Sequence, residues 1–188
     1  MKVAFNLLYF MLSLSNFNPD LIVDQNNDLC EHSSSWKPKS HGVNVSLFVP
    51  CNWEELSTSS SSSVFKFGKR DESTRVAIQV LLDLIDLPRK MSSIQAKQLL
   101  TENGLKQLSE GSGELVHTKP LLVNKVQGGQ IIRKDEPLRS ITSYKVRNYF
   151  IYKEKIVSIA YLLITPSDLD VSNHFSFCDS LLMRTLFK

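Results

Sequence analysis

The chain has 188 residues, with 22 basic and 19 acidic side chains and a net charge of +3. This length fits one domain with some additional N-terminal sequence, and it is long enough to bury a core without metal or disulfides. The charge is too small to indicate nucleic-acid binding, and no group of lysines and arginines is interleaved with aromatic residues as a stacking surface for bases requires. We therefore expect a globular domain with no nucleic-acid partner.

The N-terminal segment has the pattern of a signal peptide. Lys2 precedes a mostly apolar run over residues 3–14, and Ser13 and Ser15 offer the small side chains that favour cleavage after position 15. The run is too short to span a bilayer, and we expect no stable membrane span. We predict that residues 1–15 are removed and that the protein is secreted or periplasmic. The alternative is a buried N-terminal strand or helix of a cytosolic protein.

Residues 16–41 are polar and irregular, and we expect an arm that Cys30 and Trp36 hold against the domain. In an oxidising compartment the natural pairing is Cys30 with Cys51, with Cys178 left reduced in an apolar helical pattern. Such a disulfide would contribute roughly 3 kcal/mol by limiting the unfolded chain. The alternative is a cytosolic chain with three unpaired thiols.

Strand patterns begin at residue 42. Residues 42–56 alternate apolar and polar side chains up to a proline that cannot donate to a strand ladder, which predicts a half-buried strand. The serine-rich stretch 57–63 predicts a mobile loop, and a short strand is expected at 64–67. Residues 75–87 form a long apolar run that fits a strand buried on most of both faces, with a buried helix as the alternative.

A helix is predicted from Ser92 or Ser93 to about Gly104 or Leu108, since either serine is a good N-cap. A glycine turn follows it. The glycine at 104 is expected to break or bend the helix.

Four strands in two hairpins come next. Segments 114–123 and 126–133 meet at an Asn-Lys turn, and the pair Gly128-Gly129 indicates a bulge or a close backbone approach. Segments 142–152 and 156–164 give the strongest hairpin signal of the sequence.

The C-terminal part predicts a helix at 168–182, followed by residues 185–188 as an edge strand or a simple end. The apolar positions of this helix recur on one face. They are Val171, Phe175, Cys178 and Leu182. The complete order predicts an α+β protein with a mainly antiparallel sheet and helices packed on its faces.

This order resembles the Mog1/PsbP-like fold, an α/β/α sandwich. The resemblance rests on the strand that ends in Pro50-Cys51-Asn52-Trp53, on the helix after Ser92, and on the two hairpins followed by a C-terminal helix. It covers residues 42–188 as a single domain. Uncharacterised exported bacterial proteins have a similar "WKPK…PCxWEE" start, present here from Trp36 and from Pro50. The resemblance implies a binding or assembly protein rather than an enzyme, and it assigns no partner-binding residue.

Candidate site residues are few. Cys30, His32, His41 and Cys51 have the side chains of a Cys2His2 metal site, but their spacing matches no compact knuckle. Cys51 with His41 as its base has the chemistry of a thiol nucleophile without a supporting local motif. We therefore predict no catalytic residue, no metal ligand and no cofactor.

Trp36 and Trp53 are expected to pack the arm onto the sheet, and the alternative is an exposed contact for a partner or glycan. The leading hypothesis is an exported, non-catalytic binding or assembly module that contacts another extracytoplasmic protein through a sheet face, the serine loop or the arm. A protein with a small apolar-ligand pocket is the second hypothesis, and a hydrolase with unrecognised residues the third. A deep apolar concavity would favour the hypothesis of a ligand-binding pocket. Paired titratable groups with shifted pKa values would favour the hydrolase, and a flat surface would favour the binding module.

Overall fold

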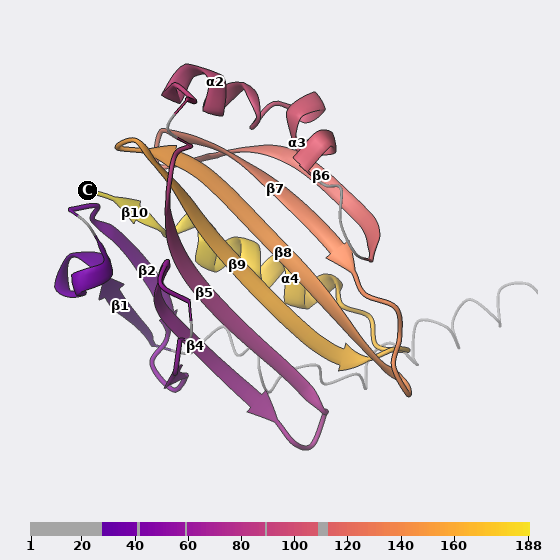
Figure 1. The fold of residues 1–188 in the computed structure, drawn as a ribbon. Coiled ribbons are helices and arrows are strands. Elements are labelled where there is room, and N and C mark those ends of the chain that lie inside the picture. Colours follow the sequence, from indigo (N-terminus) through magenta and orange to yellow (C-terminus); the bar gives the residue numbers. More distant parts are fainter. Residues whose placement is uncertain (1–27, 41, 59, 89, 109–112) are drawn as a thin grey trace, which may run out of the picture.

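A large antiparallel sheet forms the middle layer of the molecule (Figure 1). The computed structural model describes residues 28–40, 42–58, 60–88, 90–108 and 113–188. The strands of this sheet are β3 (Glu54–Leu56), β4 (Ser63–Asp71), β5 (Val76–Asp86), β6 (Glu114–Val123), β7 (Val126–Lys134), β8 (Ile141–Tyr152) and β9 (Lys155–Pro166). They lie in the order β3-β4-β5-β9-β8-β7-β6, and each neighbouring pair is antiparallel.

Two tight turns fix the register of the long hairpins. Asn124 and Lys125 join β6 to β7 with φ angles of 46° and 69°, and Lys153 and Glu154 join β8 to β9 with φ angles of 46° and 60°. Two-residue turns with a left-handed backbone match the right-handed twist of the strands that they connect. Both predicted hairpins are confirmed.

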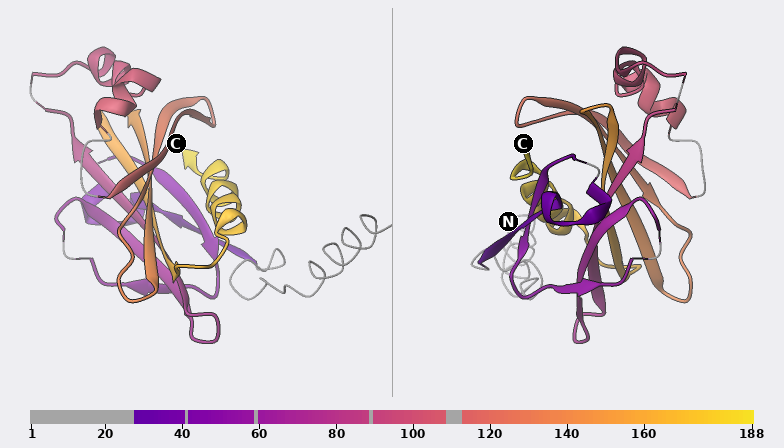
Figure 2. Two further views of the ribbon diagram at one scale, coloured as in Figure 1. Left: turned by 90° about the vertical axis from the view of Figure 1, so that its right-hand side faces the viewer. Right: turned by 60° about the vertical axis from the view of Figure 1, so that its left-hand side comes forward.

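One face of the large sheet is covered by a helix and a smaller sheet (Figure 2). The helix is α4 (Ser172–Met183), and the smaller sheet consists of β1 (Leu29–Ser33), β2 (Val45–Pro50) and β10 (Leu186–Phe187) in the order β1-β2-β10. The strand predicted at β2 is confirmed, and Val45, Leu47 and Val49 are at most 2% exposed. The prediction that it is only half-buried was wrong, because Ser46 on its other face is also buried. The predicted C-terminal edge strand is β10.

Residues 28–40 differ from the prediction of an irregular arm. They form β1 and two short 3-10 helices, η2 (Ser34–Trp36) and η3 (Pro38–Ser40). The hydroxyl of Ser34 donates to the carbonyl oxygen of Val43 at 2.6 Å and accepts from the amide of Val45 at 2.8 Å. A distant strand therefore orders this polar stretch. The predicted signal peptide, residues 1–15, lies outside the described residues.

The other face of the large sheet carries two short helices, α2 (Ser93–Gln98) and α3 (Glu102–Leu108), where one helix with a break or bend at Gly104 was predicted. Ser92 caps α2 through a reciprocal capping box with Gln95. The chain then bends before Gly104, whose amide donates to the Thr101 hydroxyl at 3.4 Å. A Cβ atom at Gly104 would lie 2.6 Å from the Cα of Leu99, so this bend requires a glycine.

The Gly128-Gly129 pair marks a close approach rather than a bulge, since β7 runs in regular register with β8 there. A Cβ at Gly128 would lie 2.4 Å from Cδ1 of Phe150, and one at Gly129 would lie 2.4 Å from Cδ2 of Leu105. The two glycines therefore let the sheet contact its own core on one side and α3 on the other.

Helix α4 begins four residues later than predicted, at Ser172, because the carboxylate of Asp170 accepts from the Ser172 amide at 2.9 Å and holds the preceding turn. The expected architecture, an α+β protein with a mainly antiparallel sheet and helices on its faces, is confirmed. Among the described residues, the helices are all too short or too polar to cross a bilayer.

Candidate functional site

The two faces of the large sheet differ in how completely they are covered. On β5, the side chains that point toward α4 are no more than 5% exposed, whereas those between them are half-buried or exposed. The buried set is Val76, Ile78, Val80, Leu82 and Leu84. The prediction that this segment is buried on most of both faces was therefore wrong: one face is core and the other meets solvent.

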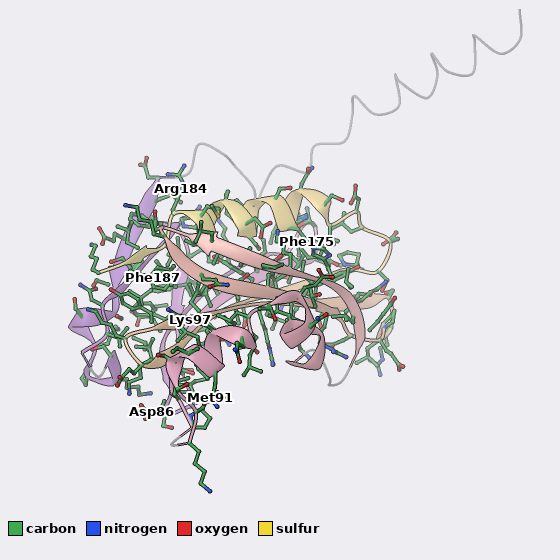
Figure 3. All side chains as sticks on the ribbon, turned by 90° about the horizontal axis from the view of Figure 1, so that it is seen from above. Asp86, Met91, Lys97, Phe175, Arg184 and Phe187 are labelled. Carbon is green, nitrogen blue, oxygen red and sulfur yellow. A yellow bond between two sulfur atoms is a disulfide. The ribbon has the colours of Figure 1, made fainter. Side chains whose placement is uncertain are left out.

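Helices α2 and α3 cover only one end of this second face. They pack Ala96, Leu100 and Leu105 onto Ile131 of β7 and Ile151 of β8. Figure 1 looks onto this face, with α2 and α3 at one end and α4 behind the sheet. Figure 3 shows the same layers from above, with Met91 and Lys97 on the opposite side of the sheet from Phe175 and Arg184.

The remainder of the second face is the candidate site, and we call it the open face. It consists of Lys66 and Arg70 of β4, Ala77, Gln79 and Leu81 of β5, Ala160, Leu162 and Ile164 of β9, and Ser143, Lys145 and Arg147 of β8. Opposing residues in the ladders put these side chains on one side of the sheet. No described helix or strand packs over this part of the sheet in Figures 1 and 2.

The centre of the open face is an apolar floor. Its members are Ala77, Leu81, Ala160, Leu162 and Ile164, all half-buried. They occupy neighbouring positions on the two central strands β5 and β9, where Leu81 lies opposite Ala160 and Ala77 opposite Ile164. Because both strands are hydrogen-bonded on both sides, the floor offers side chains and no free backbone groups.

Basic side chains flank the floor on two sides, Lys66 and Arg70 on β4 and Lys145 and Arg147 on β8. One row across four strands makes the pattern plain. It runs Lys66, Leu81, Ala160, Arg147. The two flanks are thus mainly basic and the floor is mainly apolar. Gln79 lies within the floor, and the carboxylates of Glu54 on β3 and Asp83 on β5 lie on the same side of the sheet.

Some of these charges are already paired. Lys145 forms a salt bridge with Asp135 at 2.8 Å, and Arg70 pairs with Glu72 at 2.9 Å. Hydrogen bonds from Lys145 and Ser143 hold the pKa of the Asp135 carboxyl below its ordinary value. Lys66 and Arg147 have no ion-pair partner among the described residues.

A tight turn bounds the open face at the end away from α2. Leu138 and Ile141 exchange two backbone hydrogen bonds of 2.8 and 3.0 Å around Arg139 and Ser140. Leu138 is 75% exposed and Ile141 is 45% exposed, so this turn presents two aliphatic side chains to solvent. We call these two residues the lip of the open face.

The long edge strand β6 is poorly suited to pairing with another strand. Pro120 lies within it and has no amide hydrogen to donate, and its register with β7 shifts between Leu115 and His117. Prolines and irregularities protect sheet edges in this way. The uncovered surface of the sheet is therefore available through its face rather than through this edge.

A shallow hollow of about 470 Å³ lies at α2 and α3, lined among others by Gln95, Gln98, Thr101 and Asn103. Its lining mixes polar side chains with Met91 and Leu99. It does not have the deep apolar shape that the hypothesis of a small-ligand pocket requires.

The predicted site residues lie away from the open face. Cys30 and Cys51 form a disulfide that joins β1 to the end of β2. Trp53 is 7% exposed and its ring packs on Phe177 of α4, with centroids 6.2 Å apart, so it serves the core in this structure. Of Trp36 only the backbone is described, in η2, and its role as a partner contact stays a prediction.

Among the residues that the structure describes, the sulfur and imidazole groups considered as candidates for chemistry do not form a metal site. The described residues contain no group of three or more potential metal ligands, and His41 lies outside them. Cys51 is held in the disulfide, and burial raises the pKa of the Cys178 thiol, which keeps that sulfur protonated and inert. Burial lowers the pKa of His174, whose Nδ1 is buried without a hydrogen-bond partner among the described residues.

The sequence named a sheet face as one possible contact surface but did not identify the residues of the open face, because its apolar residues occur in strands whose other face is also apolar. Only the alternation of Lys145 and Arg147 with Tyr144 and Val146 in β8 gave a signal of a charged outer face. That signal alone does not show which part of the face a helix covers.

Comparisons with known proteins address the fold. No family model matches the sequence, and no curated protein matches it either. Among solved structures, LpqN of Mycobacterium tuberculosis, involved in cell envelope biogenesis, superposes with a TM-score of 0.54 at 14% identity, over 90% of this chain and 99% of LpqN. Cyanobacterial PsbP from Synechocystis sp. PCC 6803 superposes with a TM-score of 0.52 at 11% identity, over 92% of this chain and 96% of PsbP.

The chain has the Mog1/PsbP-like fold. The Ran-binding protein Mog1p of Saccharomyces cerevisiae is also similar, with a TM-score of 0.47 at 12% identity over 86% of this chain and 96% of Mog1p, a score too low to carry an argument. The resemblance inferred from the sequence is thus confirmed as a resemblance of fold. At these identities a Mog1/PsbP-like chain does not inherit a partner or a role from its neighbours.

Proposed function

We propose that this protein is an exported, non-catalytic binding or assembly module that docks another extracytoplasmic protein on its open face. The apolar floor carries the proposal. Five half-buried apolar side chains lie together on the two central strands, and no described element covers them. Exposed apolar surface rimmed by polar groups is typical of a protein interaction site.

Three observations support an extracytoplasmic location. The N-terminal residues have the pattern of a signal peptide, and the Cys30–Cys51 disulfide suits an oxidising compartment. LpqN, which shares the fold, is involved in cell envelope biogenesis. The partner that we propose is accordingly a protein of the same compartment.

The side chains of the open face suit a binding role. The open face contains lysines, arginines, aliphatic residues and Gln79. Three carboxylates at it are already engaged: Asp135 by Lys145 and Ser143, Asp83 by the Ser63 hydroxyl, and Glu72 by Arg70. Glu54 of β3 lies on the same side of the sheet, opposite Gly68. This arrangement suits recognition by shape and charge.

Site-specific photo-crosslinking in the native host tests the proposal. A photoreactive amino acid replaces Leu162 in the floor, or Met183, which is 55% exposed on α4 on the opposite side of the sheet. We expect a discrete adduct with another extracytoplasmic protein from position 162 and none of that mass from position 183. Equal adducts from both positions, or no adduct from position 162, would refute docking on the open face.

A further inference from the structure

We propose that the segment docked on the open face is an acidic amphipathic helix of the partner, which lies along β5 and β9 between the basic flanks and beside α2 and α3. This inference rests on the proposed function and specifies the occupant of the same surface. The helix would extend the half-formed helical layer over the sheet.

The hydrogen bonding of the sheet decides between a helix and a strand. Each floor residue belongs to β5 or β9, and both strands already pair with neighbours on each side. A segment lying on this face receives no backbone hydrogen bonds from it, so it has to satisfy its own amides and carbonyls. A helix does this within itself, whereas an added strand needs a free edge.

The dimensions of the floor fit one helix. Lys66 and Arg147 lie on strands three positions apart in the sheet, β4 and β8, which places their backbones about 14 Å apart at the usual strand spacing. A helix with its side chains is about 10–12 Å wide. Along β4, the four-residue step from Lys66 to Arg70 spans about 13 Å, which corresponds to about nine helical residues.

The flanking charges decide the character of the helix. Both sides of the floor carry basic residues, and Lys66 and Arg147 lack an acidic partner among the described residues. A helix with an apolar stripe and carboxylates on both borders of the stripe would pair with them. A second copy of this chain, applied face to face, would instead bring positive flanks together.

A membrane surface fits the open face less well. The floor is recessed between longer lysine and arginine side chains, because Ala77 and Ala160 are small and all floor members are half-buried. The lip is exposed, but the charges near it mostly cancel. Arg133, Lys134 and Arg139 stand against Asp135 and Glu136, and a net charge of +1 gives little attraction to anionic lipids.

Selection from a displayed library tests the chemistry of the occupant. The probe is a library of 16-residue peptides, selected against the full chain and against a Lys66→Glu/Arg147→Glu variant. The control variant, Lys97→Glu/Lys125→Glu, makes the same change in net charge at exposed positions of α2 and the β6–β7 turn. Circular dichroism confirms that all three proteins are folded.

We expect the wild-type chain to enrich peptides with apolar residues at helical spacing and acidic residues beside them. These peptides should bind the Lys66→Glu/Arg147→Glu variant at least about tenfold more weakly, and the control variant about as well as wild type. Enrichment of basic, neutral or alternating strand-like peptides would overturn the inference. The inference would also be overturned if no peptide were enriched, or if the peptides bound both variants equally. Two further results would overturn it: a dimer of the wild-type chain that Arg147→Glu dissociates, and binding to vesicles of anionic lipid that Lys66→Glu abolishes.

The two proposals fail separately. A crosslink from position 162 to a partner segment that is neither helical nor acidic would support docking on the open face and refute the proposal of an acidic helix. The absence of any crosslink from position 162 would refute the proposal of docking on the open face.

Discussion

The adjacent residues Leu162 and Leu163 offer a matched test of the two sheet faces. They belong to the same strand, β9, and differ only in the direction of their side chains. Leu163 is 0% exposed and packs in the core beneath α4, whereas Leu162 is half-buried in the floor of the open face. Substituting each with alanine removes the same atoms from two different environments.

The expected losses differ severalfold. Truncating a fully buried leucine removes its transfer free energy and leaves a cavity, so we expect Leu163→Ala to lower the free energy of unfolding by about 3 kcal/mol. Leu162 keeps part of its surface in water, and its truncation loses only part of the transfer term. We expect Leu162→Ala to cost about 1 kcal/mol.

Urea unfolding of the purified protein, followed by circular dichroism, measures both values, with the slope of each transition checked against wild type. The reasoning also predicts that Leu162→Ala weakens the partner crosslink although it destabilises the fold far less than Leu163→Ala does. A loss for Leu162→Ala as large as that for Leu163→Ala would refute the account, because it would show that the open face is covered in the isolated protein.

Three further predictions concern the scaffold. Replacing Cys30 and Cys51 together with alanine opens a loop with a sequence separation of 21 residues and should cost about 3 kcal/mol in urea unfolding, a value that a loss below about 1 kcal/mol would contradict. Gly128→Ala places a Cβ 2.4 Å from the Phe150 ring and should destabilise the fold by about 1–3 kcal/mol, whereas an unchanged midpoint would show that this ring is free to move. Burial lowers the pKa of His174, so the neutral imidazole stabilises the fold above its ordinary pKa of 6.5, and this stability is lost as the pH falls through the pKa of the folded state. His174→Phe should therefore make the free energy of unfolding depend less on pH. An NMR titration that gives His174 a pKa above 6.5 would contradict this prediction.

Local signals predicted the hairpins well. The Asn124-Lys125 and Lys153-Glu154 turns lie between alternating strands, and both the register and the left-handed turn conformation depend on residues close in sequence. The length of β5 was also correct, because an apolar run without glycine or proline continues until the strand ends.

Features that depend on distant contacts were not predictable. Strand β1 reads Leu-Cys-Glu-His-Ser, a polar stretch that becomes a strand because β2 supplies its ladder and Cys51 its disulfide. The short helices η2 and η3 likewise follow this strand where an irregular arm was expected.

The open face is the clearest example of this limit. Residues 77, 79 and 81 carry the same alternation whether or not a helix lies over them. Their exposure follows from where α2 and α3 end, and these helices pack on β6, β7 and β8 and not on the floor. A pattern within one strand therefore predicts which side chains share a face and says nothing about what covers it.

Protection of a single introduced thiol tests docking on the open face most directly. Leu162→Cys adds a thiol to a chain whose Cys178 is 1% exposed and whose Cys30 and Cys51 form a disulfide, so a maleimide reagent would report position 162 alone. We predict rapid labelling of the purified protein and strong protection in the intact extracytoplasmic fraction, with Met183→Cys labelled equally in both. Equal labelling of position 162 in both preparations would contradict the account.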